Sequence, residues 1–62
     1  MRITIETPGC DAEVEEGIAW ITVRLHFRTF DPNHIAQWFQ ENDAVLRLAI
    51  MTIARKKTED EP

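Results

Sequence analysis

Several residue types on which enzymes rely are scarce or missing in this chain. Serine and tyrosine are absent, which excludes a serine triad. The two glycines, Gly9 and Gly17, stand apart, which excludes a glycine-rich phosphate-binding loop. Cys10 is the single cysteine, so no internal disulfide forms, and with two histidines a four-ligand zinc site is not expected. The sequence therefore predicts no catalytic residue, no metal site and no cofactor.

Long apolar runs are missing as well. No stretch approaches the ~20 apolar residues that a membrane span needs, and Met1-Arg2 leads into a short alternating segment rather than a signal peptide. The net charge of −4 disfavours nonspecific binding to nucleic acid or to an anionic membrane. Because a lone cysteine is typical of a reducing compartment, we predict a cytoplasmic protein that does not bind membranes.

What the chain has in excess is apolar residues for its size. A chain of 62 residues with 44% hydrophobic content has little interior in which to hide them. This surplus is a first reason to expect a homodimer. We predict one domain over residues 1–57 and a disordered acidic tail over residues 58–62.

The most regular pattern lies in residues 18–30. The odd positions 19–27 are apolar and the even positions 22–28 are polar or cationic, which predicts a strand with one face on the core. Residues 2–14 alternate in the same way, apart from Pro8-Gly9, which indicates a bulge or a tight turn. We therefore predict an antiparallel β-hairpin with strands at about 2–14 and 18–30.

Glu15-Glu16-Gly17 suits a three-residue hairpin loop that ends in glycine. This loop pairs Val14 with Ile18 and Ile5 with Phe27. It also places apolar side chains at the hairpin tip on the face that is polar elsewhere. Either the interruption in the first strand resets the register, or the tip carries an apolar patch of the kind found at contact surfaces.

Asp31-Pro32 marks the start of a helix, because Asp31 is a good N-cap and proline fits the first helical position. Phe30 and Ile35 have the spacing of a hydrophobic staple. The apolar spacing that follows predicts a long or kinked helix over about 32–57, and hence an α+β fold. Since a short apolar run also suits a buried strand, the alternative is a ββαβ fold with a strand at 44–55.

The segment 44–54 is apolar at all positions except Arg47 and Thr52. A helix of this kind must be covered on more than one side. The hairpin covers one side, and a second copy of the chain is the simplest cover for the other. We therefore predict a homodimer with an interface made of Val45, Leu46, Ala49, Ile50 and Ile53.

Four residues invite a chemical role, and each has a simpler explanation. Cys10 suits a small apolar position in a strand, and His26 suits a solvated strand face. His34 suits an exposed position in the first helical turn, and Asp31 suits the N-cap. The spacing of histidines and acids matches no metal-binding motif. We predict that the chain is not an enzyme, and keep a small enzyme or metal-binding protein as a second alternative.

The polar positions of the long strand are the ones that we expect to contact a partner. They are Arg24, His26 and Arg28, with Trp20 on the same strand as an exposed aromatic anchor. We predict a non-enzymatic protein–protein interaction module, a regulator, adaptor or inhibitor, that acts as a homodimer on a larger protein.

A basic strand also suggests DNA, because a two-stranded ribbon can enter the major groove. The order of basic strand, helix and second helix over residues 21–57 resembles the ribbon-helix-helix repressors, which implies a DNA-binding regulator. Here a full hairpin precedes the strand, only Asn42-Asp43 separates the helices, and the chain is acidic. DNA binding is therefore the alternative to protein binding.

Overall fold

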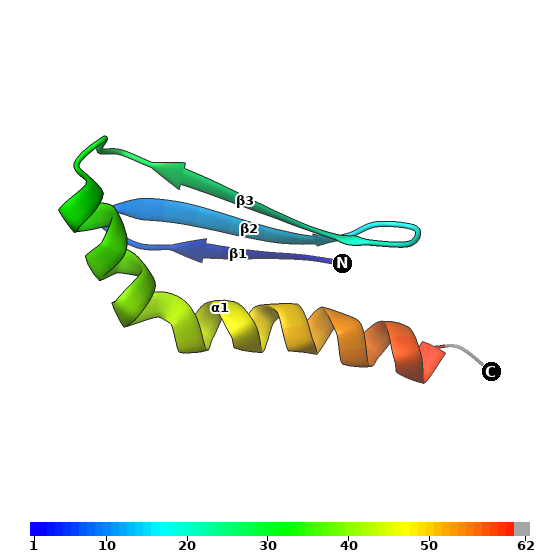
Figure 1. Cartoon of the computed structure of the whole chain (residues 1–62). Coiled ribbons are helices and arrows are strands. Elements are labelled where there is room, and N and C mark those ends of the chain that lie inside the picture. The colour runs from blue at the N-terminus through cyan, green and yellow to red at the C-terminus, as the bar shows by residue number, and fades with distance from the viewer. Residues whose placement is uncertain (61–62) are drawn as a thin grey trace.

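The computed structural model describes residues 1–60, which form a three-stranded antiparallel sheet followed by one long helix (Figure 1). Strand β1 is Arg2–Glu6, β2 is Cys10–Glu16, β3 is Ile21–Phe27, and helix α1 is Pro32–Asp60. The strand order is β1-β2-β3, so β2 is central and the other two are edge strands. The predicted α+β fold, a hairpin followed by a long helix, is confirmed. The alternative with a strand at 44–55 is wrong, because α1 is continuous there.

Each connection between strands is a tight turn closed by a backbone hydrogen bond. The Thr7 amide donates to the Cys10 carbonyl at 3.1 Å, and the Gly17 amide to the Trp20 carbonyl at 2.8 Å. Pro8-Gly9 is therefore a turn between two strands and not a bulge within one. A Cβ on Gly17 would lie 2.6 Å from Nε1 of the Trp20 indole. Glycine at this position thus lets the indole lie against the second turn.

The register differs from the predicted one. Val14 pairs with Val23 and not with Ile18, and Ile5 pairs with Ala12 and not with Phe27. The predicted loop at 15–17 is wrong, since β2 continues through Glu16. A shift by an odd number of residues turns every side chain to the other face of a sheet. The predicted register had this error, and so it placed Ala12 and Val14 on the polar face, whereas both are buried on the other one.

The helix packs on one face of the sheet, which we call the inner face. Below it, the β2 side chains Cys10, Ala12 and Val14 have no exposed surface. Near the start of the helix, Trp38 covers Cys10 and Ala12 together with the β3 residues Leu25 and Phe27. Further along, Ala49 and Ile53 cover Val14 together with Ile3 of β1. The helix therefore crosses the sheet diagonally, from the end of β3 toward β1.

The N-cap prediction is confirmed. Oδ1 of Asp31 accepts a hydrogen bond from the Asn33 amide at 2.9 Å, and its carbonyl accepts one from the Ile35 amide at 3.1 Å. The predicted hydrophobic staple is wrong, because Phe30 is fully exposed and contacts no residue that would bury it.

The helix is longer than predicted and bends once. Figure 1 shows a change of direction where the helix passes from green to yellow-green. In that part, Nδ2 of Asn42 donates to the Trp38 carbonyl at 2.9 Å, a contact of the kind that bends helices. At its end α1 reaches Asp60, so it continues into the segment predicted as a disordered tail. Glu61 and Pro62, the rest of that predicted tail, lie outside the described residues.

Candidate interaction surfaces

The helix leaves the other face of the sheet bare, and no other element of residues 1–60 covers it (Figure 1). We call it the outer face. Its middle row belongs to β2 and is acidic, with Asp11, Glu13 and Glu15 at alternate positions. Its second row belongs to β3 and carries Thr22, Arg24 and His26 opposite these acids. An acidic row and a row that contains Arg24 therefore run side by side along this face.

The structure brings the four predicted contact residues together. They occupy alternate positions along β3 and its two ends, in the order Trp20, Arg24, His26 and Arg28, with Thr22 between the first two. Trp20 is 64% exposed at the hairpin tip. The arginines and His26 are exposed as well. A single row with an aromatic side chain at one end thus faces away from the core.

Both arginines of this row have acidic neighbours. The Arg24 guanidinium lies 3.8 Å from Glu15 and 4.0 Å from Glu13, and that of Arg28 lies 3.1 Å from Oδ1 of Asp11. Exposed ion pairs of this kind contribute only ~0–1 kcal/mol each to stability. They do offset the charge of the basic row, which weakens its attraction for a phosphate backbone.

The five residues predicted for the homodimer interface are used mainly inside the chain. Ile53 is 1% exposed and lies with Ala49 on the sheet, while Leu46 and Ile50 are half-buried against the same cluster. Only Val45 is exposed, at 42%.

The side of the helix that faces away from the sheet carries Leu48 and Met51, both exposed. The predicted interface did not include these two residues. The segment has too few polar residues to mark which side faces the sheet. The three-residue spacing of Leu48 and Met51, opposite Ala49 and Ile53, was the available signal.

An apolar corner stays uncovered beside the start of β3, because the late turns of the helix lie nearer to β1. Ile21 and Val23 point to the inner face but remain 36% and 39% exposed. Next to them, a hollow of about 610 Å³ separates the hairpin tip from the late turns of α1. We define the open corner by its apolar residues, which are Ile18, Ala19, Ile21, Val23 and Ala54, whereas Trp20 only borders the hollow and directs its indole over Gly17 on the outer face. The alternation in residues 18–30 predicts Ile21 and Val23 on the core face, but it gives no indication that the helix leaves them uncovered.

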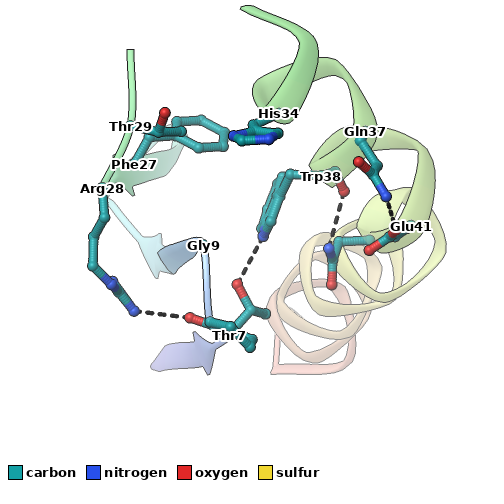
Figure 2. A pocket seen from close by; sticks show the side chains of 11 residues that line it. Thr7, Gly9, Phe27, Arg28, Thr29, His34, Gln37, Trp38 and Glu41 are labelled. Atoms are coloured by element: carbon teal, nitrogen blue, oxygen red, sulfur yellow. Dashed lines mark hydrogen bonds between the residues drawn. The ribbon is translucent and has the colours of Figure 1, made fainter. Parts of the chain in front are cut away.

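A second hollow, of about 580 Å³, lies at the opposite end, between the start of α1 and the first turn (Figure 2). Its polar groups are engaged with one another. Nε1 of Trp38 donates to Oγ1 of Thr7 at 2.7 Å, and Arg28 donates to the Thr7 carbonyl at 2.8 Å. Phe27 meets the Trp38 ring edge-on, with centroids 5.3 Å apart. These contacts fix the start of the helix on the sheet.

The residues considered for chemistry keep structural roles. Cys10 is buried, and this burial raises the pKa of its thiol, so the nucleophilic thiolate is disfavoured at neutral pH. Nδ1 of His34 lies 3.6 Å from Oδ2 of Asp31, beside the N-cap. Over residues 1–60, no three His, Cys, Asp or Glu side chains gather closely enough to hold a metal ion.

Comparisons with protein-family models, with curated proteins and with solved structures found no match. Within the described part of the chain, no helix combines the length and the apolar character that crossing a membrane requires. The function is therefore inferred from the surfaces of the molecule.

Proposed function

We propose that this chain is a non-enzymatic protein–protein interaction module, a small regulator, adaptor or inhibitor, that acts as a homodimer. It docks on a larger protein through the outer face of its sheet. The observation that supports this proposal is the row of Trp20, Arg24, His26 and Arg28 on a face that no other described element covers. Tryptophan and arginine are enriched among the residues that dominate binding energy at protein interfaces.

The charges of the outer face define the partner's chemistry. A complementary surface offers acidic side chains over the β3 row, basic ones over the β2 row, and an apolar pocket for Trp20. Because the acids and bases of the outer face already contact each other at 3.1–4.0 Å, the charges steer and orient the partner more than they add affinity. The apolar contact of Trp20 then supplies most of the binding energy.

Two further parts of the proposal rest on Cys10. Its thiol is buried and protonated at neutral pH, and the chain has no serine hydroxyl, so we expect no nucleophilic catalysis. We also place the protein in the cytoplasm, where a single free thiol persists without a disulfide partner.

The experiment compares partner capture by the full chain and by matched variants. Wild-type protein retains one stoichiometric protein partner after nuclease treatment. Trp20→Ala and the double variant Arg24→Ala/Arg28→Ala lose it, while Phe30→Ala keeps it. Phe30 is the control because it is an exposed aromatic residue outside the strands, in the connection between β3 and α1.

Two results contradict the proposal. One is capture that Trp20→Ala and Phe30→Ala reduce equally. The other is binding of duplex DNA that weakens steeply with salt and is lost in Arg24→Ala/Arg28→Ala, since this pattern belongs to the DNA-binding alternative.

A further inference from the structure

The two ends of the β2–β3 ladder define which backbone groups of β3 are free. The backbone amide of Arg28 donates to the Gly9 carbonyl at 3.1 Å, and the backbone amide of Gly17 donates to the Trp20 carbonyl at 2.8 Å. Hydrogen-bonded pairs alternate along an antiparallel ladder, so the even-numbered residues of β3 bond to β2. The N–H and C=O groups of the odd-numbered residues therefore point to the free edge. These residues are Ile21, Val23, Leu25 and Phe27.

The same odd-numbered residues carry the apolar side chains of β3 on the inner face. The diagonal helix covers them unequally. Leu25 and Phe27 lie under Trp38, whereas Ile21 and Val23 belong to the open corner. One half of the strand is thus covered and the other half is uncovered, along an edge that offers unpaired backbone groups.

We propose that a second copy of this chain pairs antiparallel along the edge of β3, with the twofold axis at Val23. The inference rests on the homodimer of the proposed function and specifies its interface. An antiparallel pair places the covered end of one β3 beside the uncovered end of the other. Phe27 and the half-exposed Phe39 of one copy then lie next to the open corner of its mate. A twofold interface requires this kind of self-complementarity.

Charge and strand length select the register. With the axis at Arg24, two arginines stand opposite each other, and like charges in such cross-strand pairs are destabilising. With the axis at Leu25, Ile21 of the open corner stands opposite Thr29, beyond the end of β3, and stays uncovered. With the axis at Val23, Arg24 stands opposite Thr22 and Trp20 opposite His26, while Ile21 meets Leu25 on the inner face. An axis at Thr22 also avoids like charges but pairs fewer residues of the strand.

The other edge of the sheet does not offer the same site. In β1, the Met1 carbonyl accepts from the Glu16 amide and the Thr7 amide donates to the Cys10 carbonyl, so the odd-numbered residues bond to β2. The backbone groups at the free edge of β1 therefore belong to Arg2, Thr4 and Glu6. Charged side chains at both ends of a short edge strand protect it from pairing. The apolar residues of β1, Ile3 and Ile5, pack against the helix. The assembly therefore closes as a dimer through β3 and does not grow head to tail.

The test measures the molar mass of the full chain by light scattering from micromolar to millimolar concentration. We expect wild type to reach twice the 7.2 kDa of the chain. Val23→Lys places two ammonium groups at the axis and raises the dimer dissociation constant by about 100-fold or more. The matched control is Val45→Lys, because Val45 is an equally exposed valine, at 42% against 39% for Val23. Val45→Lys remains dimeric.

A second pair of variants removes backbone donors without adding charge. Val23→Pro deletes an N–H at the free edge of β3. The strand tolerates proline at this position because the ladder to β2 does not use the Val23 N–H. Thr4→Pro deletes the equivalent N–H at the free edge of β1. We expect Val23→Pro to be monomeric and Thr4→Pro to be dimeric. Should neither Val23 variant fold, hydrogen exchange on wild type decides, since the Val23 amide is slow only when it bonds to a second copy.

The remaining outcomes overturn the inference. A wild-type monomer at all concentrations removes the homodimer from the proposed function too, while docking through the outer face is still decided by Trp20→Ala. A dimer that survives Val23→Lys places the interface elsewhere and leaves the proposed homodimer intact. A mass that grows without limit indicates pairing of β3 with β1 and contradicts the closed dimer.

Discussion

The two edge strands flank the same central strand, but the helix covers them to different extents and their free edges carry different side chains. Ile3 of β1 and Val23 of β3 both pair with Val14, so the three side chains form one row across the inner face. The helix packs on Ile3 and Val14 but leaves Val23 39% exposed. The free backbone groups of β1 belong to charged or polar residues, and those of β3 to apolar ones. One edge is thus protected within the chain, and the other needs a second surface to cover it.

The largest expected effect lies in the middle of this row. Val14→Lys places a charge where no surface is exposed, so the chain should lose its cooperative unfolding transition. Circular dichroism during thermal unfolding measures this. The same substitution at Val23, its direct partner on β3, should leave the fold intact. A folded Val14→Lys variant would show that the helix does not seal the centre of the sheet.

Truncation at the two edges sharpens the contrast. Ile3→Ala should lower the free energy of unfolding by ~2 kcal/mol, because a partly buried side chain leaves the core. It should not change the dimer dissociation constant. Val23→Ala should have the opposite profile, with a weaker dimer and a loss below ~1 kcal/mol in the isolated chain. Urea unfolding and light scattering on both variants separate the two effects. Equal profiles would remove the distinction between the edges.

The protected edge is also tied to the start of the helix through Thr7, which follows β1. Thr7→Val removes the oxygen that accepts from the Trp38 indole and leaves a buried donor unpaired. We expect a loss of ~1–2 kcal/mol in urea unfolding. Thr7→Ser keeps the hydroxyl and should retain most of the stability. If both variants lose the same amount, the methyl group and not the hydrogen bond is responsible.

The smallest effect concerns pH. Burial raises the pKa of the Cys10 thiol above its ordinary value of 9.0, so the native state holds this proton more tightly than the unfolded state does. This contribution to stability is complete below the unfolded pKa and declines as the pH rises through and beyond it. The urea midpoint of wild type should therefore fall more than that of Cys10→Ala between pH 8 and pH 10. Parallel pH profiles would show that the thiol is not buried in solution.

The sequence predicted the elements better than their pairing. Alternation over residues 18–30 and the Asp31 N-cap give β3 and the start of α1, because both signals depend on neighbouring residues only. The register depends on where the turn lies, and the local rules favour a loop at Glu15-Glu16-Gly17 over the turn around Ile18 and Ala19 that the structure has, because neither of these two is a typical turn residue. Val14, which the predicted register placed on the polar face, was the sign of its error.

The candidate surfaces also differ in how far the sequence alone predicts them. The row of Trp20, Arg24, His26 and Arg28 follows from alternation alone. The open corner does not, because it arises from the diagonal path of the helix, which tertiary packing determines. Of the predicted dimer residues at 45–53, Ala49 and Ile53 face the sheet, whereas Val45 is exposed.

Amide hydrogen exchange at Val23 and Thr4 tests most directly whether β3 pairs with a second copy, because each of these amides lies at the free edge of its strand. NMR on the wild-type chain at high and low concentration follows both. The edge pairing of β3 predicts that the Val23 amide exchanges slowly at high concentration and rapidly after dilution, while the Thr4 amide exchanges rapidly in both samples. A Val23 amide that exchanges as rapidly as that of Thr4 at every concentration would contradict it.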